Sequence, residues 1–206
     1  MQPRLIHAND YRRERWRNDL GWTREIARGE PDATTPSDPS AFAWRLSIAE
    51  IEHDCAFSLY PGCDRHLVLL SGNGMTLAFD DGKSIEVLPP HGRVAFAGER
   101  APHCRLLDGT THDFNVMVRR DRCSAQVLHR PLVGSMVFFA ESGVSWAIYL
   151  LAGGARIKQA DLLLAPGDTV LLQDEPGAAA RQILDGAGEV LLVRLQRVDP
   201  LAAGDR

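Results

Sequence analysis

Residues 15–26, RWRNDLGWTREI, gather side chains that could hold a small polar ligand. Asn18 and Thr23 can each make a neutral hydrogen bond, Glu25 can accept one from an N–H group, and Trp16 offers an apolar wall. Hydrogen-bonding groups beside indole rings are typical of a polar pocket with apolar walls. The structural alternative is that the tryptophans anchor an N-terminal segment and the polar residues cap a turn.

Arg65 is the second candidate, because it follows the turn YPGCD and precedes the apolar run HLVLL. This position is the entrance of a predicted strand, at the rim of a barrel. A planar guanidinium there could bind a carboxylate with two parallel hydrogen bonds, which lysine does less well. The alternative for Arg65 is a structural ion pair with Glu99 or Asp64.

Two predicted strands carry polar residues along one face. In DFNVMVR the alternation places Asp113, Asn115 and Met117 together, and in FAWRLSI it places Arg45 with Ser47. Taken alone, a half-polar strand face favours solvent. In a barrel, however, one face of every strand points into the lumen, and these residues could line it.

The histidine spacing argues against a metal centre. Metal centres in small β-barrels commonly use an H-x-H pair, a later Glu and a further His. Here His103 sits in the usual position of the further His, but the H-x-H pair is absent, since His66 has Asp64 and Val68 two residues away, and no histidine follows His129. We therefore predict no metal site and no cofactor.

Other catalytic motifs are absent too. The sequence contains no G-x-S-x-G elbow and no phosphate-binding G-x-x-x-x-G-K-[ST] motif. Four cysteines form no C-x-x-C pair, so we expect free thiols, with Cys104 a small buried residue. An acid/base pair of Asp113 and Glu25 is conceivable, but nothing in the spacing brings the two together.

Short apolar runs alternate with Gly and Pro turns such as PGCD, SGNG, DDGK and APGD, which predicts a β sandwich or barrel. Short helices remain possible near residues 9–15 and 135–141. The stretch GEPDATTPSDPS at 29–40 is predicted to be a mobile surface loop.

An internal repeat organises the chain. Glu99, Asp108 and Arg120 recur as Glu175, Asp185 and Arg197, at separations of 76, 77 and 77 residues. Each copy has the strand and turn order of a small jelly-roll barrel. The predicted fold is therefore all-β, a bicupin with one barrel over residues 1–125 and a second over 126–206.

Charge and hydropathy limit the classes of partner and the cellular location that we expect. The formal net charge is −4 and no basic run dominates, which argues against nucleic acid or an anionic membrane. The N-terminus lacks the apolar stretch of a signal peptide, so we expect a cytoplasmic protein. A homodimer is possible for such barrels.

Several of these segments together resemble the HutD/Ves family of bicupins, whose members carry W-x-N-G-G-G-x-T-R-E-I near the N-terminus. The corresponding words are WRNDLGWTREI, WRLSIAEI, FSLYPGCDR, FAGE, CRLLDG and DFNVMVRR, within residues 16–120. Asp19 and Leu20 stand where the family usually has two glycines. If those glycines supply positive φ angles or close backbone approach, the site differs here.

The resemblance implies a role in histidine utilisation, by binding a pathway metabolite such as urocanate or a formylated glutamate derivative, and it brings no established catalytic activity. Our first hypothesis is thus a non-enzymatic binding protein for a small carboxylate. The residues expected to neutralise the anion, orient it or wall the pocket are Trp16, Asn18, Thr23, Glu25, Arg45, Arg65, Asp113, Asn115 and Met117. The alternatives are a metal-independent cupin enzyme acting on a small acid, and a structural partner of a pathway protein.

Overall fold

The computed structural model describes residues 1–29, 42–173, 175 and 177–198. Its regular structure there is β-strand, apart from one 3-10 turn, η1, at Ala8–Asp10. None of the described segments forms a helix with the length and apolar character needed to cross a membrane. The chain divides into two compact units, Arg12–Arg122 and a second unit that combines Met1–Tyr11 with Cys123–Arg206.

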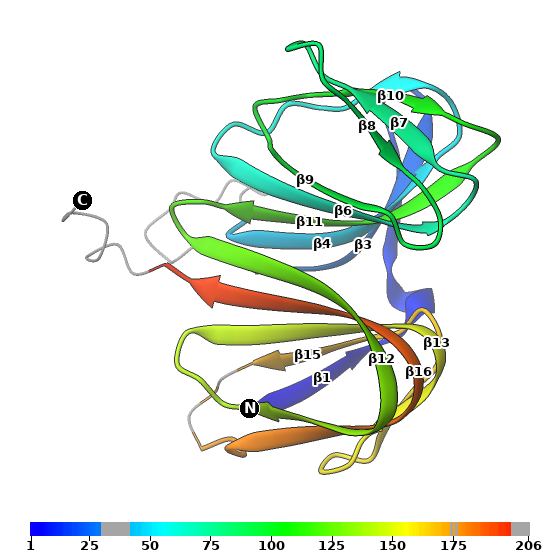
Figure 1. Ribbon diagram of the computed structural model, residues 1–206. Helices are drawn as coiled ribbons and strands as arrows, with labels where there is room; N and C mark the ends of the chain where they lie inside the picture. Colours follow the sequence, from blue (N-terminus) through cyan, green and yellow to red (C-terminus); the bar gives the residue numbers. More distant parts are fainter. Residues whose placement is uncertain (30–41, 174, 176, 199–206) are drawn as a thin grey trace. The chain divides into compact units, whose positions relative to one another are not determined.

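The Arg12–Arg122 unit is built from two β-sheets that face each other (Figure 1). The six-stranded sheet has the order β2-β3-β4-β11-β6-β9, with β2 Arg12–Arg15, β3 Gly21–Gly29, β4 Trp44–Ile51, β11 Thr111–Arg119, β6 Cys63–Ser71 and β9 Arg93–Ala97. The four-stranded sheet has the order β5-β10-β7-β8, with β5 Cys55–Ala56, β10 His103–Leu106, β7 Met75–Ala78 and β8 Ser84–Val87.

An apolar cluster lies between these two sheets. It joins Ala49 and Leu69 of the six-stranded sheet to Met75, Leu77 and Cys104 of the four-stranded sheet. We call the side of the six-stranded sheet that points into this cluster its inner face. Since successive strand residues alternate sides, every second residue of β3, β4, β6 and β11 lies on the inner face.

The opposite face of the six-stranded sheet is buried as well. Leu46, Ile48, Phe114 and Val116 alternate with the inner-face residues, and each is at most 1% exposed. These side chains are the apolar alternate residues of β4 and β11 that the sequence shows. The polar positions of β4 and β11 alternate with these residues and share a face with Ala49 of the apolar cluster, so they belong to the inside of the barrel and not to solvent.

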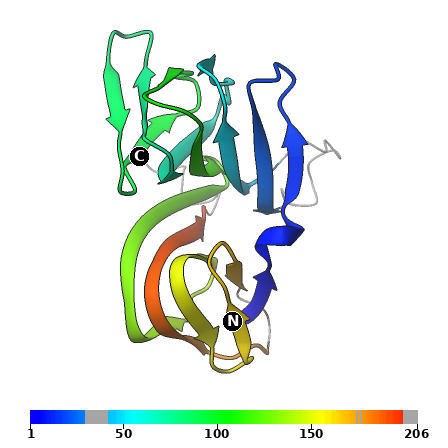
Figure 2. The same ribbon diagram turned by 90° about the vertical axis from the view of Figure 1, so that its right-hand side faces the viewer.

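The second unit is a six-stranded arrangement with the order β1-β15-β13-β16-β12, in which β14 also pairs with β13. Its strands are β1 Gln2–Ile6, β12 Cys123–Phe139, β13 Val144–Ile157, β14 Leu162–Leu164, β15 Thr169–Gln173 and β16 Arg181–Arg197. The long strands β12, β16 and β13 curve side by side (Figure 2). Their inward residues, among them Ile148, Leu184 and Leu192, form an apolar core.

The first eleven residues differ from the sequence-based domain assignment, which placed residues 1–125 in the first barrel. β1 pairs with β15, from Gln2 opposite Gln173 to Ile6 opposite Thr169. The Asp168 carboxylate then accepts a hydrogen bond from the Ala8 amide at 2.9 Å. Strand pairing over such a sequence separation leaves no local signal, so the pattern of turns could not reveal it.

The internal repeat is visible in the pairing of the strands. β11 pairs with β6 and β6 with β9, just as β16 pairs with β13 and β13 with β15. The short helix considered possible near residues 9–15 is reduced to the 3-10 turn η1, since residues 12–15 form β2. The helix considered possible near residues 135–141 is wrong, because Ser135–Phe139 continue β12. Residues 30–40 of the predicted surface loop lie outside the described residues, and Gly29 ends β3.

Candidate functional site

The pairing register brings most of the candidate residues onto the inner face of the Arg12–Arg122 unit. Across β11 and β4, Asp113 lies opposite Ala49, Asn115 opposite Ser47, and Met117 opposite Arg45. Across β11 and β6, Met117 lies opposite Arg65. On β3, Thr23 and Glu25 lie opposite Ala49 and Ser47.

Arg65 is a buried cation held among aromatic rings. Arg65 is 6% exposed. Its guanidinium carbon lies 5.1 Å from the ring centres of Phe57 and Phe96 and 5.6 Å from that of Tyr60. Such cation–π contacts hold a guanidinium without neutralising its charge. Burial lowers the pKa of Arg65, and the nearby Asp113 opposes that change.

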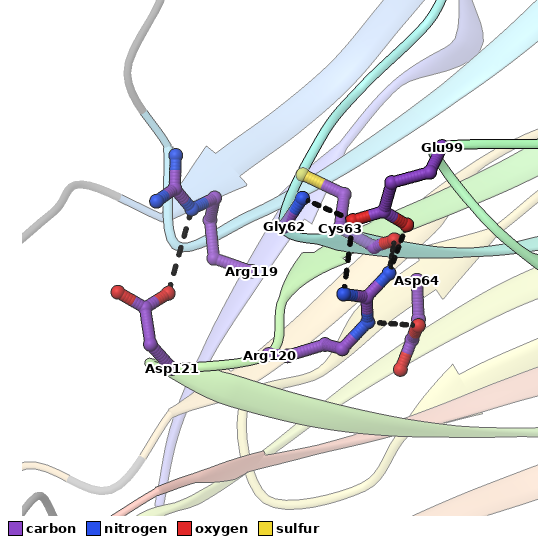
Figure 3. Close-up of polar contacts among 7 residues, drawn as sticks. All are labelled: Gly62, Cys63, Asp64, Glu99, Arg119, Arg120 and Asp121. Carbon is purple, nitrogen blue, oxygen red and sulfur yellow. Dashed lines mark hydrogen bonds and ion pairs between the residues drawn. The ribbon is translucent and has the colours of Figure 1, made fainter.

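The alternative pairing proposed for Arg65 does not occur. A different arginine, Arg120, binds both Asp64, at 2.6 Å from its Nε, and Glu99 (Figure 3). Glu99 also accepts a hydrogen bond from the Gly62 amide at 2.7 Å. Within the described residues the Nε atom of Arg65 has no hydrogen-bond partner.

Three successive inner-face positions of β11 carry polar atoms without a partner in the described part of the chain. They are Thr111 Oγ1, both carboxylate oxygens of Asp113, and Asn115 Oδ1. Thr111 and Asp113 are 0% exposed and Asn115 is 8% exposed. Buried polar groups in proteins are normally hydrogen-bonded, so a row of unpartnered ones marks a place where a polar ligand would be stabilised.

Burial raises the pKa of Asp113 to about 7, and Arg65 only partly opposes this effect. An ionised carboxylate surrounded by apolar groups is costly, so the neutral acid is favoured. Strongly shifted groups are common at functional sites. Asp113 is accordingly the most perturbed carboxyl group of this face.

Glu25 has the opposite environment. Burial disfavours its ionised form, but hydrogen bonds from Arg28 and Arg45 outweigh burial and lower its pKa. The Arg28 and Arg45 Nε atoms each lie 2.7 Å from a Glu25 oxygen. Glu25 thus balances neighbouring arginines, and Arg45 is already paired with a carboxylate of the chain.

The opening segment divides between the inner face and a turn. Trp16 packs against the apolar cluster, and its Nε1 donates to Thr23 Oγ1 at 2.8 Å. Asn18 is exposed, and its Oδ1 accepts from the Leu20 amide at 3.2 Å, which is the turn-capping alternative. Asp19 has a φ of 57°, a left-handed backbone conformation that suits glycine. Asp19 therefore adopts this conformation at a position where the family usually has glycine.

The two histidines considered as metal ligands lie apart from the unpartnered row. His66 occupies β6 between Arg65 and Leu67, on the opposite side of the sheet, and His103 is exposed on β10. Cys104 is 0% exposed, as expected for a small core residue, and lies directly across from Cys55. Both thiols are free.

Sequence reasoning missed Thr111 and the aromatic rings around Arg65. Phe57 and Tyr60 stand in the same word, FSLYPGCDR, as Arg65, so their proximity along the chain was a usable signal. Phe96 approaches from β9 because it lies opposite Arg65 in the register. Thr111 continues the alternation of Asp113 and Asn115 by one step toward the start of β11.

A pair of units built from β-sheets in this repeated order defines a two-barrel protein of the cupin fold. YhhW from Escherichia coli, a cupin-fold protein, has a TM-score of 0.68 with 10% identity, covering 97% of this chain and 98% of that chain. This likeness concerns the fold alone. Residues 8–192 match the HutD family, and the chain belongs to that family.

Relatives agree with this assignment. Protein Ves of Cronobacter sakazakii (strain ATCC BAA-894) is 34% identical over 177 residues, which cover 85% of this chain and 89% of that protein. HutD from Pseudomonas fluorescens SBW25, in a structure described as a formate condition, has a TM-score of 0.80 with 28% identity, covering 96% of this chain and 100% of that chain.

A Pseudomonas putida relative is described as an uncharacterized 21.2 kDa protein in the region 3′ of hutC. It is 38% identical over 126 residues, 61% of this chain. The match spans 63% of that relative's length, less than two thirds. The family is linked to histidine utilisation.

Proposed function

We propose that the Arg12–Arg122 unit binds a small carboxylate metabolite on its inner face through Arg65, and that this binding modulates histidine utilisation. The observation that carries the proposal is a buried guanidinium with no carboxylate bound to it among the described residues. Arg45 and Arg120, by contrast, each hold a carboxylate of the chain. Arg65 is therefore the arginine of this group that is suited to an external anion.

Neighbouring groups support the orientation of such a ligand. Asn115 Oδ1 is an unpartnered acceptor for an N–H group of the ligand, and Met117 supplies an apolar surface directly across from Arg65. The formate condition of the Pseudomonas fluorescens HutD structure adds a small carboxylate as a first probe. Urocanate and formylated glutamate derivatives are the candidate metabolites of the pathway.

A thermal-shift screen followed by calorimetry tests the proposal, using formate, urocanate, formylglutamate, formiminoglutamate, glutamate and histidine. A ligand at 100 times its Kd stabilises the native state by about 2.7 kcal/mol, which such a screen detects. Arg65→Ala should weaken binding by about 1.5–3 kcal/mol, the contribution of a charged hydrogen bond. Arg65→Lys should restore only part of it, since the planar fork is lost.

Arg105→Ala is the matched control, because Arg105 is exposed on β10 of the same unit. Equal loss of binding in both variants would contradict the role given to Arg65. No stabilisation by any ligand of the panel would contradict the binding function and favour a partner of a pathway protein.

A metal-independent enzyme is the second candidate, because the unit holds two carboxyl groups in contrasting states. Arginine contacts lower the pKa of Glu25, whereas burial raises that of Asp113 to about 7. Carboxyl groups driven apart in this way are suited to different acid and base roles. Turnover of a panel metabolite that is lost in both Glu25→Gln and Asp113→Asn would favour this function.

A further inference from the structure

Asp113 occupies a part of the inner face with little to stabilise a negative charge. It lies opposite Ala49 on β4 and opposite Leu69 on β6. It is 0% exposed, and neither carboxylate oxygen has a hydrogen-bond partner among the residues that the structure describes.

The charged and titratable groups that act on Asp113 are few. Arg65 of β6 attracts its charge, while the free thiols of Cys55 on β5 and Cys104 on β10 interact with it across the barrel. On β4, β7 and β9 the core residues of this region are apolar. Arg65 is thus the single cation acting on Asp113 in the described part of the chain.

The strand register explains why Arg65 and Asp113 do not pair directly. Arg65 lies opposite Met117, and Asp113 is four residues earlier on β11. At about 3.3 Å per strand residue, the two positions are roughly 13 Å apart along the sheet. Asn115, with its own unpartnered oxygen, lies between them. The long arginine side chain shortens this separation, and the charges of Arg65 and Asp113 act on each other. A small anion held by the Arg65 guanidinium on its Asp113 side would therefore lie within reach of both residues.

We propose that Asp113 contacts the ligand as a neutral carboxylic acid, so that the barrel takes up a small monocarboxylate together with one proton. This inference rests on the proposed function. A neutral acid donates its O–H to an oxygen of the ligand, while Arg65 balances the ligand's negative charge. An ionised Asp113 would instead repel the ligand, since two carboxylates that share a site do not both stay charged.

The proposal also sets the class of ligand. One guanidinium balances one negative charge, and the O–H of Asp113 needs an acceptor beside it. A monocarboxylate group fits both requirements, whereas a sulfate dianion would leave one charge uncompensated in a buried place. The site is therefore expected to prefer formate to sulfate.

Calorimetry with formate at pH 6, 7 and 8 tests the proton directly. Formate itself stays ionised over this range, so a pH effect belongs to the protein. With a pKa of about 7 for Asp113, the affinity should fall roughly tenfold from pH 6 to pH 8. At pH 8 the binding heat should also change with the ionisation enthalpy of the buffer, in proportion to the uptake of close to one proton.

Asp113→Asn gives the second arm, because asparagine is of the same size and cannot ionise. The variant should bind formate with an affinity independent of pH, and the heat should no longer vary with the buffer. Asp80→Asn is the matched control, since Asp80 is exposed in a turn of the same unit. It should keep the wild-type pH profile.

The outcomes separate the two proposals. If wild-type protein binds formate through Arg65 with equal affinity at all three pH values, and with heats that do not depend on the buffer, the proton inference is wrong and the binding function stands. If Asp113→Asn keeps the wild-type pH profile, the inference is wrong as well. If formate and the larger acids do not bind at any pH, both proposals fail. The buffer comparison needs no variant, so a folding defect of Asp113→Asn would not prevent the test.

Discussion

Replacing Asp113 with asparagine should change how stability depends on pH, even without a ligand. The folded state raises the pKa of Asp113 from its ordinary value of 3.8 to about 7, so it binds this proton more tightly than the unfolded chain does. The contribution of Asp113 to stability is therefore full below pH 3.8 and is lost as the pH rises toward 7. Asparagine carries no such proton.

The size of this effect follows from the shift. Each pKa unit corresponds to about 1.4 kcal/mol, so from pH 5 to pH 7 the wild type should lose about 2–3 kcal/mol relative to Asp113→Asn. Above pH 7 the difference between the two proteins should level off, because the native carboxyl group then ionises too. Other titrating groups contribute equally to both proteins and cancel in the comparison.

Urea unfolding of both proteins at pH 5, 6, 7 and 8 measures this difference. The expected result is a free energy of unfolding that falls more steeply with pH in the wild type than in Asp113→Asn. A difference that stays constant across the four pH values would refute the reasoning, because it would mean that Asp113 is ionised in the folded protein at pH 5. Asp80→Asn, at an exposed position, should parallel the wild type throughout.

Two further predictions concern the framework. Asp19 has a φ of 57°, so Asp19→Val should destabilise the protein by about 1–2 kcal/mol in thermal or urea unfolding. Asp19→Gly should remain within about 1 kcal/mol of the wild type, and equal loss in both variants would assign the cost to the side chain of Asp19. Asp168 accepts from the Ala8 and Ala165 amides, so Asp168→Ala should cost about 1–3 kcal/mol and speed hydrogen exchange in β1. Unchanged exchange there would show that the strand pairing alone holds the N-terminal segment.

The fold could be predicted from the sequence because local signals repeat. Gly and Pro turns mark the strand ends, and the same landmarks recur 76–77 residues later, so two barrels follow without any distant contact being known. The membership of β1 in the second unit could not be found in this way. It depends on pairing between residues about 170 positions apart, from Gln2 opposite Gln173 onward.

The candidate site was predicted in part, and its difficulty has a physical cause. Alternation separates the two faces of β11 correctly, but it does not say which face is inside. The half-polar face of Asp113, Asn115 and Met117 looked suited to solvent, whereas Phe114 and Val116 opposite them looked like core. Both faces are buried, so apolar content alone could not identify the lumen.

Most charges of the Arg12–Arg122 unit discussed above are compensated within the chain. On the inner face Glu25 is held by Arg28 and Arg45, and elsewhere Arg120 holds Asp64 and Glu99. Arg65 remains on aromatic rings that leave its charge intact.

Asp113 remains among apolar neighbours, at a distance along β11 that prevents direct pairing with Arg65. A barrel that needed only stability would gain from apolar residues at both positions, since buried charges are costly to keep. The cost of burying Arg65 and Asp113 is explained if a bound ligand supplies their missing partners. Its carboxylate would lie at Arg65, and its hydrogen-bonding atoms would lie near Asn115 and Asp113. Removing both charges together, as in Arg65→Met with Asp113→Leu, should then leave a stable barrel that no longer binds formate.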